Sequence, residues 1–150
     1  MDTKDIEAEA ATLMLDSFTE ATALRLGKIL VDLALADALP VVINIRTADR
    51  TLFHAALPGS APLNDLWARR KSNTALAFQL PSLLVGLRNK AKAEGLDRHG
   101  LPPGDYADSG GAVPVRVKGV GMVAVATVSG LPQVEDHKLV VRGLKALIAG

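Results

Sequence analysis

The chain has 150 residues, and its 49 % hydrophobic content is enough apolar material for one globular domain spanning residues 1–150. Its 17 basic and 16 acidic residues leave a formal net charge of +1, so no broad attraction to nucleic acid or to an anionic membrane is expected. The absence of cysteine excludes disulfides, thiolate nucleophiles and Cys-ligated metal, and a cytoplasmic location fits this composition best.

The amino-terminal segment "MDTKDIEAEAATLML" is acidic before any apolar run, which is not the pattern of a secretory signal. We expect a separate short helix within these first 15 residues. The most apolar stretch, "KILVDLALADALPVVINI", is interrupted by Asp32, Asp37 and Pro40. It therefore lacks the roughly 20 consecutive apolar residues that a membrane-spanning helix needs.

The first half of the chain predicts a helix, a hairpin and two further helices. Apolar residues at helical spacing predict a helix over residues 19–37, with Ser17 as its N-cap and Glu20 completing a capping box. Two runs of β-branched and aromatic residues around "TADR" predict a β-hairpin within residues 39–59. A helix is expected over 62–78, and Pro81 should end it and begin another.

The second half predicts a loop, a second hairpin and a closing helix. "LDRHGLPPGDYADSGG" has loop composition, and "AVPVRVKGVGMVAVATVSG" predicts two strands that turn at Lys118-Gly119. The last helix is expected over 132–148, with Pro132 in its first turn. The predicted fold class is α/β of the α+β type: one antiparallel sheet built from two hairpins, with helices on both faces, in a three-layer sandwich like those of profilin and PAS domains.

Two cations in the 62–78 helix face inward or nearly so. At about 100° per residue, Trp67, Lys71 and Thr74 share one stripe with Phe78, while Arg70 lies at its margin. Arg69 falls on the opposite, solvated side. The aliphatic stems of Lys71 and Arg70 could cover the edge of the core, or the two cations could pair with carboxylates. Alternatively, they form the positive wall of a pocket.

The stretch "EDH" at the start of the last helix allows two interpretations. The same helical geometry places His137 in line with Val141, Leu144 and Ile148, so His137 should point toward the sheet. Asp136 in the first turn could simply complement the helix dipole, and His137 could be a neutral core residue. The alternative is that both contact a ligand.

Established catalytic signatures are missing from the sequence. It contains no Walker loop, no H-E-x-x-H and no G-x-S-x-G, and "GVGMVA" has the glycines of a strand pair without a dinucleotide fingerprint. The three histidines have no metal-ligand spacing, so no metal site is predicted, although folding could unite two of them with Asp105 or Asp136. The low aromatic content, 3 %, does not favour base stacking with nucleic acid.

The segment "DYADSGGAVPVRVKGVGMVAVATVSGLPQVEDHKLVVRGL" resembles the haem-degrading-domain superfamily, which includes glycolate-operon proteins and domains attached to corrinoid enzymes. The blocks "LFHAALPG", "WARRKSNT" and "SGLPQVEDH" resemble its largely uncharacterised cytoplasmic branch of bacteria and yeast. The resemblance implies an antiparallel sheet with helices on both sides, assembled into dimers or larger rings. The polar positions that recur in the family match here at Trp67, Arg70, Lys71, Asn73, Asp105, Tyr106, Gly110, Gly111, Ser129, Asp136 and His137.

One departure from this resemblance is Ser109, where the branch often carries histidine before the double glycine. This departure removes a potential ligand for a metal or haem. Haem is the cofactor that the resemblance implies, but the available iron ligands are reduced to His54, His99, His137, Tyr106 and the methionines.

Three functional hypotheses follow. The preferred one is a homo-oligomer that binds a small anionic molecule, with a tetrapyrrole as one candidate, between the 62–78 helix, the Gly110-Gly111 turn and the 132–148 helix. An enzyme of unassigned reaction would use His137 as acid or base, assisted by Asp136 or Tyr106. An assembly module would bind no ligand. The residues expected to bind the ligand are Trp67, Arg70, Lys71, Asn73, Gly110, Gly111, Ser129 and His137.

Overall fold

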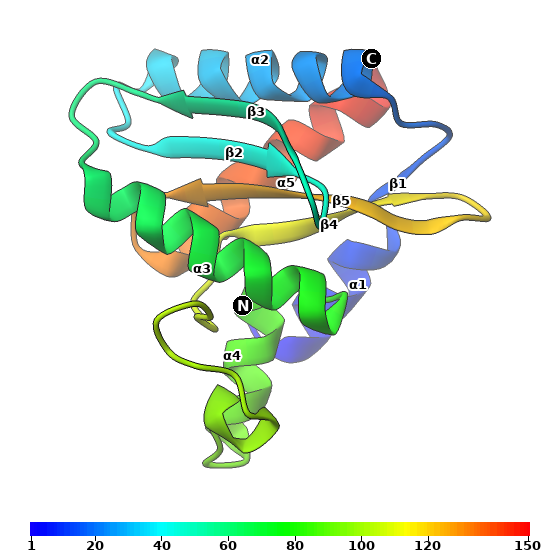
Figure 1. The fold of residues 1–150 in the computed structure, drawn as a ribbon. Coiled ribbons are helices and arrows are strands. Elements are labelled where there is room, and N and C mark those ends of the chain that lie inside the picture. Colours follow the sequence, from blue (N-terminus) through cyan, green and yellow to red (C-terminus); the bar gives the residue numbers. More distant parts are fainter.

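The computed structural model describes residues 1–150 as five α-helices, one short 3-10 helix and a five-stranded sheet of order β1-β4-β5-β2-β3 (Figure 1). In chain order the elements are α1 (Thr3–Ala11), β1 (Met14–Leu15), α2 (Glu20–Ala36), β2 (Val42–Arg46), β3 (Thr51–Ala56), α3 (Pro62–Phe78), α4 (Ser82–Ala91), η1 (Leu96–His99), β4 (Ala112–Val117), β5 (Gly121–Ser129) and α5 (Gln133–Ala149). No helix combines the length and the hydropathy needed to span a lipid bilayer.

Both predicted hairpins form, and they join into one sheet through antiparallel pairing of β2 with β5. The predicted α+β sheet with helices on both faces is confirmed. One strand was not predicted: β1 pairs in parallel with β4, with Met14 opposite Arg116, so the complete sheet is mixed. A strand of two residues is too short to show the alternating pattern by which strands are recognised in a sequence.

Three helix boundaries show how local residue types act. The N-cap of α2 is Thr19 instead of the predicted Ser17, and its backbone N–H donates to the Thr22 hydroxyl at 3.0 Å. The helix α3 ends at Phe78 as predicted, because Gln79 takes a left-handed conformation with φ of 55°. Pro81 then precedes α4, since proline can stand at a helix start but not in its interior.

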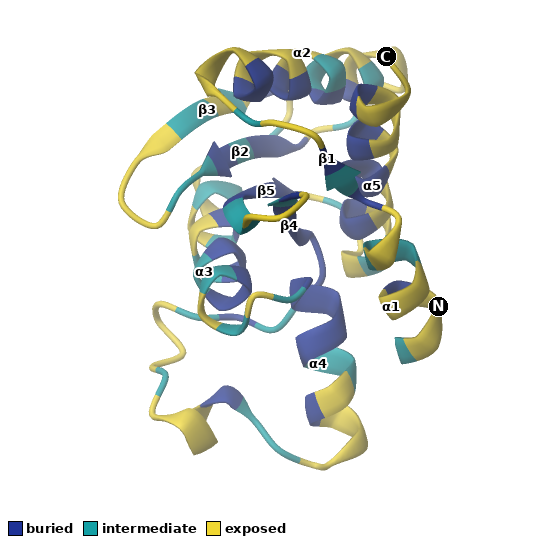
Figure 2. Ribbon diagram, turned by 90° about the vertical axis from the view of Figure 1, so that its right-hand side faces the viewer, coloured by how far each residue is buried: buried dark blue, intermediate teal, exposed yellow.

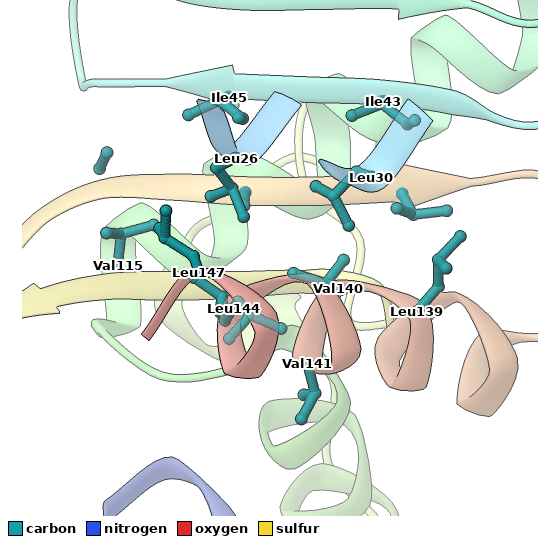
Figure 3. Close-up of a cluster of buried hydrophobic side chains, with 14 of the residues drawn as sticks. Leu26, Leu30, Ile43, Ile45, Val115, Leu139, Val140, Val141, Leu144 and Leu147 are labelled. Carbon is teal, nitrogen blue, oxygen red and sulfur yellow. The ribbon is translucent and has the colours of Figure 1, made fainter. Parts of the chain in front are cut away.

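The apolar core lies on the face of the sheet that α2 and α5 cover, while α3 covers the other face (Figure 1). Alternate strand residues point into this core, where leucines of α2 and α5 meet them (Figure 3). Its central side chains are Leu26, Leu30, Ile43, Ile45, Val115, Val140 and Leu144. In Figure 2 most of β2 and the inner sides of these helices are buried, whereas the edge strand β3 is intermediate to exposed and the outer side of α2 is exposed.

The layer between the sheet and α3 is polar and contains small side chains. Lys71, Ser72 and Thr74 of α3 are buried there, as is Thr127 of β5. Ala75 belongs to the small apolar cluster on this side. Because this layer contains few apolar groups, hydrogen bonds and ion pairs must position α3 against the sheet.

Candidate functional site

A cavity of about 290 Å³ lies between α3, the turn that precedes β4, and the start of α5. Its volume is at the lower end of the range typical of small-molecule sites. The residues that line it are Asn64, Trp67, Lys71, Ser109, Gly110, Ser129, Gly130, Leu131, Gln133 and Asp136.

Lys71 connects the elements around this cavity. Its side chain is 3 % exposed, and Nζ donates to the carbonyl oxygens of Gly110 (3.0 Å) and Val128 (2.7 Å) and to the Asp136 carboxylate (3.1 Å). These three acceptors use all three hydrogens of the ammonium group. Lys71 therefore joins α3 to the turn, to β5 and to α5, and it has no donor left for a ligand.

Asp136 is the counter-ion of Lys71 and also holds the chain just before α5. Its carboxylate accepts hydrogen bonds from the backbone N–H groups of Leu131 (2.9 Å) and Gly130 (3.4 Å). Burial raises the pKa of Asp136 and lowers the pKa of Lys71, and in each case the attraction of the partner opposes the shift. The hydrogen bonds fit the ionised pair, because Lys71 only donates and Asp136 only accepts.

The double glycine makes room for this ion pair. Gly111 has φ of 133°, and a Cβ there would lie 2.4 Å from the Lys71 Nζ and 2.4 Å from the Val128 carbonyl oxygen. A Cβ on Gly110 would lie 2.6 Å from the Gln133 carbonyl oxygen. Any side chain at either position would displace backbone or the buried ammonium.

The cavity lining is rich in hydrogen-bond donors. The Gln133 Oε1 accepts the Gly110 N–H at 2.9 Å, and the Asn64 Oδ1 accepts the Ala61 N–H at 2.8 Å. Because a backbone N–H occupies each amide oxygen, both NH₂ groups remain free to donate. The Trp67 indole N–H also forms no hydrogen bond within the chain, so the lining complements a ligand that carries acceptors.

Sequence reasoning did not select Asn64 or Gln133. Asn64 could have been found, since it lies three residues before Trp67 on the inward stripe of α3. Gln133 gives no comparable signal, because its role depends on a contact with Gly110, which is distant in sequence.

Five of the predicted site residues are not among those that line this cavity: Arg70, Asn73, Tyr106, Gly111 and His137. The Arg70 guanidinium stacks over the Trp67 ring at 4.3 Å, and its Nε donates to the Pro103 carbonyl oxygen at 2.8 Å. Asn73 donates to a backbone carbonyl oxygen in the same loop. Tyr106 lines a second cavity, on the side of Trp67 where Arg70 lies. Of the residues expected to form one site, some line the first cavity, Arg70 and Tyr106 line the second, and Asn73, Gly111 and His137 line neither.

Comparison with known proteins identifies the family. The family model described as "Haem degrading protein HbpS-like" matches residues 18–145. The chain belongs to this HbpS-like family. The predicted superfamily is therefore confirmed, and the match begins after α1 and β1.

Relatives and solved structures agree with this assignment. UPF0303 proteins of Streptomyces coelicolor and Burkholderia thailandensis are 47 % and 46 % identical over 145 and 147 residues, covering 96 % and 97 % of this chain and 92 % and 89 % of theirs. The crystal structure of the Ybr137w protein has a TM-score of 0.91 at 29 % identity and covers 100 % of this chain and 90 % of its own. PduOC, solved as a haem complex, has a TM-score of 0.73 at 20 % identity, over 88 % of this chain and 95 % of its own, and this likeness shows the fold alone.

The residues of this HbpS-like chain do not fit a haem iron at the cavity. The lining contains no histidine, tyrosine or methionine, which are common iron ligands in proteins without cysteine. Both ring nitrogens of His54 are engaged, by Asn44 at 3.0 Å and by Asp65 at 2.7 Å. His99 packs edge-on against Phe78. No group of three or more His, Asp or Glu side chains is placed to hold a metal ion.

His137 lies outside both cavities of the HbpS-like chain. It is 1 % exposed, and its Nε2 lies 2.7 Å from the Glu9 carboxylate of α1. The expected alignment with Ile148 does not place both residues in the core, because Ile148 is 40 % exposed. Burial lowers the pKa of His137, opposed by Glu9, and its buried Nδ1 has no partner, so the neutral ring donates from Nε2.

The three candidate catalytic residues are therefore not brought together. Asp136 lines the first cavity, Tyr106 lines the second, and His137 contacts α1. Helical spacing predicted that His137 would be buried. It could not show which element would cover this side chain, because α1 is far away in sequence.

Proposed function

We propose that this HbpS-like protein binds a small molecule with a carboxylate or phosphate group in the cavity between α3 and α5. The observation that carries the proposal is the donor-rich lining, with free NH₂ groups on Asn64 and Gln133 and the free indole N–H of Trp67. Anionic oxygens accept several hydrogen bonds at once, and such charge-assisted bonds are about twice as strong as neutral ones. The first turn of α5 also borders the cavity, and its dipole favours an anion.

In this proposal Lys71 positions the binding groups and does not contact the ligand. Its three hydrogens are used within the chain, and Asp136 neutralises its charge. An anion is then recognised by oriented neutral donors. This arrangement favours a ligand whose groups accept hydrogen bonds from these donors.

We also propose that the protein acts as a homo-oligomer in the cytoplasm. Several large apolar side chains are more than 45 % exposed, on the outer sides of α2 and α3 and in the β4–β5 turn: Leu24, Leu35, Leu63, Leu66 and Val120. A second copy of the chain would remove such groups from water. The absence of cysteine agrees with a reducing compartment.

The binding proposal is tested by replacing one hydrogen-bond donor of the cavity with an acceptor while keeping the fold. Gln133→Glu retains an oxygen that accepts the Gly110 N–H, but it replaces the free NH₂ group by a carboxylate oxygen. Organic acids, phosphates and tetrapyrroles are screened by thermal shift on the wild type, and each hit is measured by calorimetry on both proteins. We expect Gln133→Glu to weaken binding of an acid at least about tenfold, which corresponds to about 1.4 kcal/mol.

A matched control separates local from general electrostatics. Lys145→Gln changes the net charge by the same amount on the exposed side of α5, and it should bind as the wild type does. Asn64→Asp makes the same change on α3: it replaces the free NH₂ group by a carboxylate oxygen and keeps an oxygen that accepts the Ala61 N–H. If no acid binds the wild type, or if Gln133→Glu binds every hit as tightly as Lys145→Gln, the proposal is wrong.

A further inference from the structure

A second cavity of about 390 Å³ adjoins the first one. Trp67 and Ser109 line both cavities, so the two cavities are neighbours that share this part of their walls. The second cavity lies between α3 and the loop that follows α4 (Figure 1). Its apolar lining comprises Leu96, Leu101, Pro103, Tyr106 and Ala107, together with Trp67.

The loop over the second cavity is held to α3 by several bonds. Arg69 forms an ion pair with Asp105 at 2.8 Å, and Asn73 donates to the Asp105 carbonyl oxygen at 2.8 Å. Further along the loop, the Ala107 N–H donates to the Thr74 hydroxyl at 3.1 Å. These contacts hold residues 105–107 of the loop against α3, so this wall of the second cavity is in place before any ligand binds.

The charges of the second cavity differ from the donor character of the first. The carboxylates of Asp97 and Asp108 lie in its lining, and Arg70 is the single cation there. Arg70 is already stacked on Trp67 and bonded to the Pro103 carbonyl oxygen. A second anionic group would meet two carboxylates, so this cavity suits an uncharged, apolar body.

We propose that the two cavities hold one ligand of an amphipathic class: an acid whose anionic head lies among the donors of the first cavity and whose hydrocarbon or aromatic body passes Trp67 into the second. This inference rests on the proposed function for the head and assigns the rest of the molecule. Leu101 and Leu96 then contact the body, and Ser109 lies beside its path.

The test is a homologous series of linear carboxylates, from acetate through hexanoate to decanoate. Their binding is followed by proton–nitrogen NMR in every protein. In the proteins without an added tryptophan it is also followed by the fluorescence of Trp67, the single tryptophan of the chain. Once the chain of the acid is long enough to pass Trp67, each added methylene should tighten binding by about fourfold until the second cavity is full. Leu101→Trp fills the second cavity and should remove this gain.

Two further variants keep the result interpretable. Leu101→Ala removes a contact without filling space, and it should reduce the gain for each methylene even if Leu101→Trp does not fold. Ala21→Trp adds the same ring at an exposed position of α2, on the other face of the sheet from both cavities, and should bind the whole series as the wild type does.

The outcomes separate the two proposals. If acetate and hexanoate bind equally well and Gln133→Glu weakens both, the head site stands and the amphipathic class is overturned. The same conclusion follows if both Leu101 variants bind the long acids as the wild type does. If no carboxylate of the series binds and no acid or phosphate of the screen binds either, the proposed function fails and this inference falls with it.

Discussion

Replacing Lys71 by methionine should destabilise the fold strongly, because the buried ion pair joins four elements. Methionine keeps most of the volume but leaves the Asp136 carboxylate without a counter-ion, and the carbonyl oxygens of Gly110 and Val128 without their donor. Breaking a buried pair by removing one partner costs about 3–5 kcal/mol. That loss is a large fraction of the roughly 5–15 kcal/mol by which a typical domain is stable.

The loss in Lys71→Met should depend on pH in a defined direction. Burial already raises the pKa of Asp136 above 3.8, and removing Lys71 removes an attraction that opposes this rise. A carboxyl whose folded pKa exceeds its unfolded pKa favours folding below the unfolded pKa, and this benefit is lost as pH rises through the folded pKa. The gap between wild type and variant should therefore be largest at neutral pH and should shrink toward about pH 4.

Urea unfolding followed by Trp67 fluorescence measures this gap, and a double mutant supplies the control. Asp136→Asn can still accept the Leu131 N–H but carries no charge, so Lys71→Met with Asp136→Asn should be more stable than Lys71→Met alone at neutral pH. A loss below about 1 kcal/mol in Lys71→Met, or a loss equal at both pH values, would refute the assignment of a buried ion pair.

Three further predictions follow from the same structure. Burial lowers the pKa of His137 in the folded protein, so below pH 6.5 the unfolded chain binds more protons and the free energy of unfolding decreases. The stability advantage of the wild type over His137→Gln should therefore shrink on acidification. A constant difference in urea unfolding would contradict this. Gly111→Val should lower the melting temperature more than Gly143→Ala does. Gly143→Ala should also be destabilising, because its Cβ would lie 2.4 Å from the buried Leu30. Equal melting curves would show that the Gly110-Gly111 turn is misinterpreted. Light scattering should give a mass of at least twice 15.7 kDa, and a monomer at micromolar concentration would exclude the oligomer.

The parts of the fold that depend on local pattern could be predicted from sequence. The bounds of α3 followed from helical periodicity, and the inward direction of Lys71 followed from helical geometry. Its alternatives were a stem that covers the edge of the core, a carboxylate partner, or a place in the positive wall of a pocket, and the structure supplies the partner, Asp136. The distance in sequence between these residues hid the pairing, since periodicity says which side a residue faces but not what lies opposite.

The candidate site was harder to predict because contacts between segments distant in sequence decide which side-chain donors remain free. Gln133 has an unremarkable position in the first turn of α5, and only its bond to the Gly110 N–H leaves its NH₂ group free. His137 shows the opposite case, since its burial was expected but α1 covers it. The family resemblance named recurrent positions such as Arg70 and Tyr106 without showing that they border a different cavity.

The unequal layers of the sandwich set an order in which the molecule opens. The side covered by α2 and α5 contains the large apolar cluster, whereas α3 is held mainly by polar contacts such as those of Lys71. Segments with few buried apolar contacts open at lower free energy than the core. Amide hydrogens of α3 should therefore exchange with solvent through partial opening, while those of α5 wait for global unfolding. A ligand that bridges the two helices would slow exchange in α3 first, so occupancy becomes visible there before it changes the global unfolding midpoint.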